Sequence, residues 1–337
     1  MTDATENTQA HVAAMHPGHF VALSGGVGGA KLVLGLSKLL DPAQITIVAN
    51  TGDDFEHLGL KICPDLDTVL YTLADWNNKE LGWGQVGESW NFLDALKRLG
   101  GESWFNLGDR DLATHFVRTQ MLNQGKSLSE VVTHLSQLLG IAEKIVPMTD
   151  DQVSTIIHCD PQGSLSFQHY FVRDRCEPTI TGFEFAGMNT ASPSRGFLQA
   201  LDDKLTAILV CPSNPFVSVD PILKLPGIVT RLQALDVPLV VVSNIIGGEA
   251  IKGPAAKMMS ELGIPRTALG VAQHYVDSYG DLFKGFVLDQ RDAHLKDEIE
   301  SLGLAVTVTN TLMVTVEDKI NLAADVLAFT HSLGARS

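Results

Sequence analysis

Hydrophobic positions along the chain form short β-branched runs that alternate with helical patterns. The first three are HFVALSGG at 19–26, AKLVLGLSKLL at 30–40 and ITIVANTGDD at 45–54, which predict a strand, a helix and a strand. Continuous apolar runs, typical of strands buried on both faces, recur in KLTAILVCPSNP, VPLVVVSNIIGG, GFVLD and LAVTVTN. This order predicts an α/β fold in which a Rossmann-like parallel sheet is flanked by helices.

Two central stretches depart from this alternation. Residues 112–140 have helical spacing, and SLSE at 127–130 forms a capping box. Residues 151–186 alternate as antiparallel strands do, with a DPQG turn that favours a hairpin. We therefore expect one domain over residues 19–337, with a helical insert and a small antiparallel β region at about 105–200.

Composition limits the cellular setting and the partners. Residues 1–18 lack the basic start and the apolar core of an export signal, so we expect a flexible leader and a cytoplasmic protein. No apolar run approaches the length of about 18 residues that a membrane span needs. The net charge of −15 argues against nucleic acid, because phosphate backbones are bound by clustered Lys and Arg. A small anionic substrate would need backbone amides, a few placed cations or a divalent metal.

Cysteine and histidine spacing excludes several chemistries. The four cysteines form no CxxC pair, so neither a zinc site nor a redox dithiol is indicated, and we expect buried free thiols. The eleven histidines show no HExxH spacing, which leaves a histidine metal site or a Ser-His-Asp hydrolase without support.

The glycine-rich segment SGGVGGAK at residues 24–31 lies between the first predicted strand and the first helix. Free amides and the helix dipole favour an anion there, and the glycines allow close approach of a phosphate. The segment matches neither GxGxxG nor GxxxxGK[ST]. A tight turn without a ligand is the alternative interpretation.

Four aspartates gather near the end of the second predicted strand. Asp53 and Asp54 follow that strand directly, and Asp65 and Asp67 follow within a few residues. The carboxyl ends of parallel strands face the ligand crevice, so Asp53 should share an edge with the glycine loop. Adjacent acids repel unless a cation intervenes, which makes a divalent metal the natural occupant. Alternatively, Asp65 and Asp67 only cap the following helix.

Three further loops and a group of tryptophans carry polar or aromatic side chains of interest. NLGDRD at 106–111 combines acids with a base, and an Asp–Arg ion pair that orders the loop is the alternative. Prolines on both sides of Ser213 and Asn214 hold that segment extended after a buried strand. Lys252 adds a cation after a Gly-Gly pair, unless it is merely solvated. Four tryptophans lie close together in the sequence, and they indicate a stacking surface for a flat heterocycle or, alternatively, core or lid packing. They are Trp76, Trp83, Trp90 and Trp104.

Seven of these segments, taken in order, resemble one known family. SGGVGGAK, NTGDD, PDLDTVLYTLA, LGDRDLATH, PMTDD, PSNPFVSVDPIL and KGPAAKMM are similar to the 2-phospho-L-lactate transferase family of coenzyme F420 biosynthesis, from about Phe20 to the last helix. The resemblance implies transfer of a phosphorylated three-carbon acid from a guanosine diphosphate adduct to 7,8-didemethyl-8-hydroxy-5-deazariboflavin. GMP would be released with magnesium present, some bacterial members would use the phosphoenolpyruvate adduct, and a homodimer is expected.

The resemblance also implies roles for individual residues. Asp53, with Asp65 or Asp54, would bind Mg²⁺, and Asp53 or Asp67 would accept the hydroxyl proton. Gly25 to Gly29 with Ser213 and Asn214 would hold the nucleotide diphosphate, and Asp67 with the loop from Asn106 to Arg110 would contact the deazaflavin. The full set of predicted substrate contacts is Gly25, Gly26, Gly28, Gly29, Lys31, Asn50, Asp67, Asn106, Asp109, Arg110, Ser213, Asn214 and Lys252.

Departures from the family pattern bear on the donor. This chain reads GGVGGAK where archaeal members tend to read GGTGTPK, and Cys63 stands where a serine precedes Pro-Asp. Both favour the phosphoenolpyruvyl donor. Two rival interpretations are a regulatory or sugar-nucleotide-binding relative, which would lack LGDRDLAT and PSNP, and an NAD-dependent dehydrogenase, which the failed GxGxxG disfavours.

Overall fold

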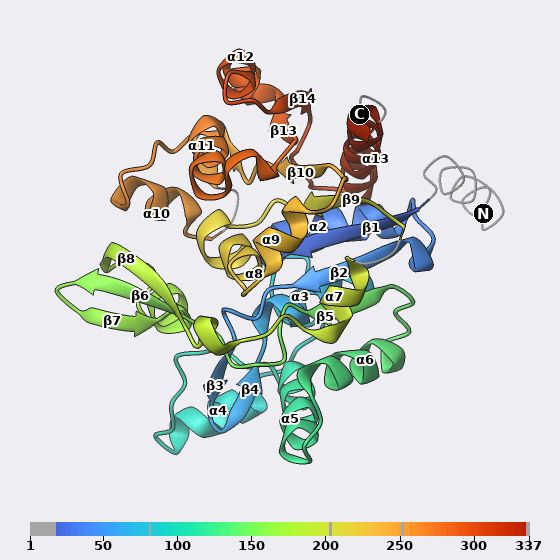
Figure 1. Cartoon of the computed structure of the whole chain (residues 1–337). Coiled ribbons are helices and arrows are strands. Elements are labelled where there is room, and N and C mark those ends of the chain that lie inside the picture. Colours follow the sequence, from blue (N-terminus) through green and yellow to red (C-terminus); the bar gives the residue numbers. More distant parts are fainter. Residues whose placement is uncertain (1–17, 81, 202–203, 251–252, 335–337) are drawn as a thin grey trace.

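A seven-stranded parallel sheet forms the centre of the protein (Figure 1). The computed structural model describes residues 18–80, 82–201, 204–250 and 253–334. From one edge to the other, the strands are β5 (Lys144–Pro147), β2 (Ile45–Ala49), β1 (His19–Ser24), β9 (Leu205–Val210), β10 (Leu239–Val242), β13 (Gly285–Asp289) and β14 (Ala305–Thr309). The predicted α/β fold with a Rossmann-like parallel sheet is confirmed.

The strand order places a switch point between β1 and β9. β1 pairs with β2 on one side and with β9 on the other, all in parallel. The chain moves outward from β1 through β2 to β5, and later outward from β9 through β10 to β14. The loops after β1 and β9 therefore diverge, and this divergence opens a ligand crevice at the carboxyl edge of an open sheet.

Two hydrophobic cores lie on opposite faces of the sheet, because side chains alternate along each strand. In β1, Phe20 and Ala22 join one core, whereas Val21 and Leu23 join the other. The helices on the first face are α2 (Gly26–Ser37), α3 (Pro64–Leu73), α6 (Leu128–Leu138) and α13 (Val316–Gly334). Those on the second are α7 (Arg195–Ala200), α8 (Asp220–Leu223), α9 (Ile228–Gln233), α10 (Ala255–Glu261), α11 (Ala268–Tyr279) and α12 (Lys296–Glu300).

The segments outside the main sheet largely follow the predicted pattern. Helix α5 (Asp109–Asn123) precedes α6, whose N-terminus carries the predicted capping box of Ser127 and Glu130. The small antiparallel sheet consists of β6 (Ser154–Asp160), β7 (Gly163–Ser166) and β8 (Thr179–Ala186), which project to the left in Figure 1. The sequence pattern missed β5, which divides the predicted insert and belongs to the main sheet.

Short elements complete the described part of the chain. A hairpin of β3 (Phe55–His57) and β4 (Leu60–Ile62) precedes α3, and α4 (Asn91–Arg98) precedes α5. The others are η1 (Pro42–Gln44), η2 (His169–Arg173), η3 (Met188–Thr190), η4 (Pro215–Val219), β11 (Ile245–Ile246), β12 (Glu249–Ala250), η5 (Gly280–Leu282) and η6 (Gln290–Leu295). No described helix combines the length and the apolar character needed to cross a membrane. All four cysteines are free thiols, and three of them are buried as predicted, whereas Cys176 is only partly buried.

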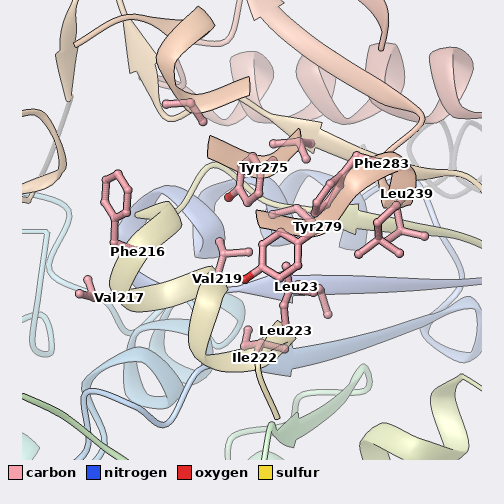
Figure 2. Packing of buried hydrophobic residues seen from close by; sticks show 14 of the residues in the cluster. Leu23, Phe216, Val217, Val219, Ile222, Leu223, Leu239, Tyr275, Tyr279 and Phe283 are labelled. Carbon is pink, nitrogen blue, oxygen red and sulfur yellow. The ribbon is translucent and has the colours of Figure 1, made fainter. Parts of the chain in front are cut away.

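The segment after β9 is anchored deeply in the second core. Figure 2 shows side chains of η4 and α8 packed against residues of β1, β10, α11 and the turn that follows it. The labelled members are Leu23, Phe216, Val217, Val219, Ile222, Leu223, Leu239, Tyr275, Tyr279 and Phe283. Each large apolar side chain buried in this way contributes about 1.5–3 kcal/mol. The PSNP turn that precedes η4 therefore rests on a rigid base.

Candidate active site

A cavity of about 530 Å³ lies at the switch point between β1 and β9, within the size range of small-molecule sites. Its polar lining comes from the segments after five strands of the sheet, β1, β2, β9, β10 and β14. These residues are Gly25, Gly26, Val27, Gly28, Lys31, Asp53, Asp65, Pro212, Ser213, Asn214, Ser218, Ser243, Asn244 and Thr311. The strand-end loops thus converge as the topology requires.

The glycine loop is locked to the PSNP turn across the switch point. Ser213 Oγ accepts the Gly25 amide proton at 3.1 Å and donates to the Gly25 carbonyl oxygen at 2.8 Å. A Cβ on Gly28 would lie 2.2 Å from the Pro212 carbonyl oxygen, and one on Gly29 would lie 2.5 Å from Ser24 Oγ. These glycines therefore permit packing of α2 against neighbouring loops, a reason that the sequence interpretation did not supply.

The N-terminus of α2 presents only part of its amides to a substrate. The Gly26 amide, at a φ of +62° that favours glycine, donates to Asp65 Oδ1 at 2.7 Å. Val27 and Gly28 follow in the first helical turn, where amides have no intrahelical acceptor, and both line the cavity. Of the glycine-rich segment predicted to bind an anion, the amides of Val27 and Gly28 and the positive end of the helix dipole are the groups that could do so.

Asp53 carries the most perturbed carboxylate of the cavity. The residue is 7% exposed, and its Oδ1 atom is buried without a hydrogen-bond partner. Burial, and after it the neighbouring carboxylates of Asp65 and Asp54, raise the pKa of Asp53 well above its usual range. A buried oxygen without a hydrogen-bond partner lowers the stability of the folded protein. A proton or a cation bound to Asp53 Oδ1 would remove this cost.

Asp65 is held rigidly beside the glycine loop. Its Oδ1 accepts from Gly26, and its Oδ2 accepts from the Asn50 side-chain amide at 2.9 Å. Asn50 is fully buried, also donates to the Val217 carbonyl oxygen at 3.2 Å, and does not line the cavity. Burial raises the pKa of Asp65 to about 6, although the hydrogen bonds from Asn50 and Gly26 lower it. Asp65 does not cap α3, whose cap residue is Cys63.

The residues present at this edge fit a divalent cation. Asp53 and Asp65 both line the cavity, and in the described part of the chain neither forms an ion pair. The one described cation in the lining is Lys31, whose Nζ donates to the Met313 carbonyl oxygen at 2.8 Å. Carboxylate oxygens with an unsatisfied buried lone pair are the donors that Mg²⁺ prefers. The pair could therefore hold magnesium.

Asp54 and Asp67 face away from the cavity. Asp54 lies 3.5 Å from Lys61 Nζ, and burial raises its pKa while Lys61 lowers it. Asp67 accepts from both terminal nitrogens of Arg118, a fully buried guanidinium, one of them at 3.0 Å. Neither aspartate lines the cavity. This placement favours Asp53 over Asp67 as proton acceptor and Asp65 over Asp54 as its partner.

A second carboxylate cluster lies outside the cavity lining and already contains a cation. Ligand atoms of Asp67, Asp111 and His115 lie within 4.8 Å of one another. Arg118 Nη1 lies 3.2 Å from His115 Nδ1, and Tyr71 donates to Asp111 at 2.6 Å. The Arg118 guanidinium already supplies the positive charge that a metal ion would bring to these carboxylates. The cluster is therefore a structural ion-pair network between α3 and α5.

The cavity lining also has an apolar, aromatic part. Its rings come from Trp83, Phe105, Phe167 and Phe171. Phe167 and Phe171 stack at 5.5 Å, and Gln168 between them donates to the Asp53 carbonyl oxygen at 3.5 Å. The cavity therefore combines helix-start amides and carboxylates with aromatic surface suited to a flat ring system.

The remaining predicted residues fall into three groups. Asn106 and Asn214 line the cavity, and the Asn214 side chain also accepts from the Phe216 amide at 3.0 Å. Asp109 and Arg110 lie outside its lining. Lys252 lies outside the described residues, although the adjacent Gly253 lines the cavity.

Several lining residues were not predicted. Asn244 and Thr311 follow β10 and β14, so the rule that strand ends face the crevice could have found them. Phe105 directly precedes the NLGDRD segment, and Phe167 and Gln168 lie in the predicted antiparallel region, where the alternation indicates strands but no ligand. Only the tertiary fold brings them to the cavity.

Comparison with known proteins identifies relatives over nearly the whole chain. Residues 20–315 match the family described as 2-phospho-L-lactate transferase CofD. The chain is 40% identical to the phosphoenolpyruvate transferase of Kitasatospora aureofaciens over 318 residues, covering 93% of this chain and 98% of that protein. It is 39% identical to the 2-phospho-L-lactate transferase of Methanosarcina mazei, with coverage of 90% and 97%.

A solved structure has the same fold. A member of the UPF0052 family from Bacillus halodurans aligns with a TM-score of 0.64 at 14% identity, covering 92% of this chain and 98% of that protein. At this identity the similarity concerns the fold alone. The family match and the sequence relatives decide the assignment: the chain belongs to the 2-phospho-L-lactate transferase CofD family.

Proposed function

We propose that this protein transfers a phosphorylated three-carbon acid from its guanosine diphosphate adduct to the terminal hydroxyl of 7,8-didemethyl-8-hydroxy-5-deazariboflavin. The hydroxyl oxygen forms a bond to the phosphorus next to the acid, the bond from that phosphorus to the GMP oxygen breaks, and GMP leaves. The observation that carries the proposal is that one cavity is lined both by carboxylates with helix-start amides and by aromatic rings. The first suits the diphosphate, and the second suits the deazaflavin ring.

The donor diphosphate would bind at the start of α2. Amides of Val27 and Gly28 and the helix dipole favour its charge, and Lys31 adds the described cation of the lining. Ser213 fixes the loop through its two bonds to Gly25. These groups orient the diphosphate, which supplies much of the rate acceleration in phosphoryl transfer.

Magnesium would be held by Asp53 and Asp65. When bound, it supplies positive charge that stabilises the charge developing on the phosphate oxygens. The net formal charge of −15 makes such local compensation necessary for an anionic donor.

Asp53 would accept the proton of the attacking hydroxyl at Oδ1. That atom is buried without a hydrogen-bond partner, which leaves it open to the proton of the hydroxyl. The aromatic part of the cavity lining would orient the ring so that the ribityl chain reaches this carboxylate.

The donor acid is assigned to phosphoenolpyruvate on the two sequence departures at the glycine loop and Cys63. Relatives bearing either name are similarly close, at 40% and 39% identity, so identity alone does not separate the donors. The enzyme should therefore accept the phosphoenolpyruvyl adduct at least as well as the 2-phospholactyl adduct.

The test incubates the full chain with Mg²⁺, the deazaflavin and each guanylyl adduct separately. Product mass and GMP release are measured, with chelator and Asp53→Asn as negative controls. A deazaflavin product from either adduct with stoichiometric GMP supports the transferase, and its mass identifies the acid. Tight adduct binding without a product from any adduct would instead indicate a regulatory nucleotide-binding protein.

A further inference from the structure

The LGDRD motif exchanges helix caps with the segment before α4. Glu88 accepts the amide protons of Arg110 at 2.8 Å and Asp111 at 2.9 Å, at the start of α5. Asp109 in turn accepts the amide protons of Asn91 at 3.1 Å and Phe92 at 3.0 Å, at the start of α4. Each carboxylate thus satisfies the free amides of the other helix.

Two glycines and an arginine complete this exchange of helix caps between Glu88 and Asp109, which we call the clamp. A Cβ on Gly108 would lie 2.2 Å from the Glu88 carboxyl carbon, so a side chain there would displace the carboxylate. Gly87 has a φ of +69°, and Arg110 Nη1 passes beside it to donate to the Val86 carbonyl oxygen at 2.8 Å. The motif therefore fixes the backbone from Val86 onward with little freedom.

The clamp holds two aromatic walls of the cavity. Trp83 lies five residues before Glu88, and Phe105 lies four residues before Asp109; both rings line the cavity. Trp90, on the clamped segment, meets Trp83 edge-on at 6.2 Å. Trp83 is still 42% exposed, so much of its indole surface is available to a ligand. We call residues 82–90 the Trp83 arm.

We propose that Trp83 is a specificity-determining residue that stacks on the flat conjugated ring of the acceptor, and that Asp109, Arg110 and Glu88 are positioning residues that act through the Trp83 arm. Asp109 and Arg110 lie outside the cavity lining, and their contacts go to the arm and to the start of α4. The motif thus contributes to the acceptor site without touching the acceptor. This inference rests on the proposed function.

The first experiment measures acceptor and donor KM and acceptor Kd for Trp83→Ala and Trp83→Phe. Trp83→Ala should raise acceptor KM and Kd about 10-fold to 100-fold, the range for loss of one stacking contact, while Trp83→Phe recovers most of the affinity. Donor KM should change less than about twofold. Trp76→Phe is the matched control, because Trp76 is also exposed but does not line the cavity.

The second experiment combines substitutions. Asp109→Ala and Arg110→Met should each raise acceptor KM about 3-fold to 10-fold with kcat nearly unchanged, because the arm moves. In the Trp83→Ala background the same changes should add little. Arg98→Met, at an exposed position on α4, is the matched control for Arg110→Met, and melting temperatures verify that each variant is folded.

The outcomes separate the two levels of the proposal. If wild type forms no deazaflavin product, the proposed function fails and this inference fails with it. If wild type is active and Trp83→Ala has a normal acceptor KM and Kd, the stacking role alone is overturned. If the Asp109 and Arg110 effects add fully to that of Trp83→Ala, these residues contact the acceptor directly and the positioning role is overturned.

Discussion

Four aspartates that lie within fifteen residues of sequence divide into two pairs with opposite environments. Asp53 and Asp65 face the cavity, and neither forms an ion pair with a described residue. Asp54 and Asp67 face the interior behind it, where Lys61 and Arg118 supply countercharges. All four are at least nine-tenths buried, so burial alone does not distinguish them.

The difference follows from local geometry. The chain turns at Gly52 and Asp53, where the Asp54 amide donates to the Thr51 carbonyl oxygen at 3.2 Å, and this turn separates the Asp53 side chain from that of Asp54. Residues two apart on a helix lie on different faces, which separates Asp65 from Asp67 in the first turn of α3. One acidic segment can thus provide reactive carboxylates to a ligand and ion pairs to the core. The presence of a protein cation tells the two roles apart.

The largest expected effect is that of Asp53→Asn. It should lower kcat/KM by about 1000-fold, or about 4 kcal/mol of barrier, because it removes the base and a metal-site charge. Without metal it should raise the free energy of unfolding by about 1–3 kcal/mol, since a buried unpaired carboxylate is destabilising. Urea unfolding with chelator and with Mg²⁺ measures both: Mg²⁺ should stabilise wild type and not the variant. Activity near that of wild type would mean that Asp53 is neither the base nor a required metal ligand.

Breaking the buried pair should instead affect folding. Arg118→Met leaves Asp67 buried without its cation and should cost about 3–5 kcal/mol of unfolding free energy. Asp67→Leu combined with Arg118→Met should recover most of that loss, because two apolar side chains need no countercharge. Urea denaturation measures all three proteins. If the double variant is stable but its kcat is as low as that of Asp53→Asn, Asp67 has a catalytic role after all.

The pH dependence should show the raised pKa of the cavity pair. At limiting Mg²⁺, activity should fall as pH decreases through about 6, because protons then compete with the cation for Asp65. For stability the sign is opposite. The folded pKa values exceed the ordinary carboxyl value, so the folded state binds more protons and the contribution of the pair declines as pH rises from about 4 through 6.

Stability curves of wild type and Asp53→Asn in chelator measure this second effect. The difference in unfolding free energy, wild type minus variant, should become more negative as pH rises from 5 to 8. A difference that is constant with pH would mean that Asp53 does not have a raised pKa.

Much of the fold was predictable because its signals are local. The runs that became β1, β2, β9 and β10 are continuous and apolar, and buried parallel strands require that pattern. β5 was missed because Lys144–Pro147 is a short edge strand that ends in proline and offers only four residues. Such a strand is recognised by pairing with β2, which is a non-local property.

The candidate site was predictable in part for the same reason. Strand-end logic placed Asp53 and the glycine loop at one edge, and both line the cavity. It could not separate Asp53 from Asp54, because the separating residues, Lys61 and Arg118, lie on other elements. Nor could it show that Asp109 and Glu88 serve as exchanged caps, since the amides that donate to each carboxylate lie about twenty residues away.

The smallest expected effect is that of Asp54→Asn, the matched control for Asp53→Asn. Asp54 contacts Lys61 rather than the cavity, so activity at neutral pH should stay within about threefold of wild type, as for other changes away from the reacting groups. Its negative charge nevertheless raises the pKa of Asp53. The substitution should therefore shift the acidic limb of the kcat/KM profile to lower pH. A large loss of activity without such a shift would place Asp54 at the metal and erase the division between the two pairs.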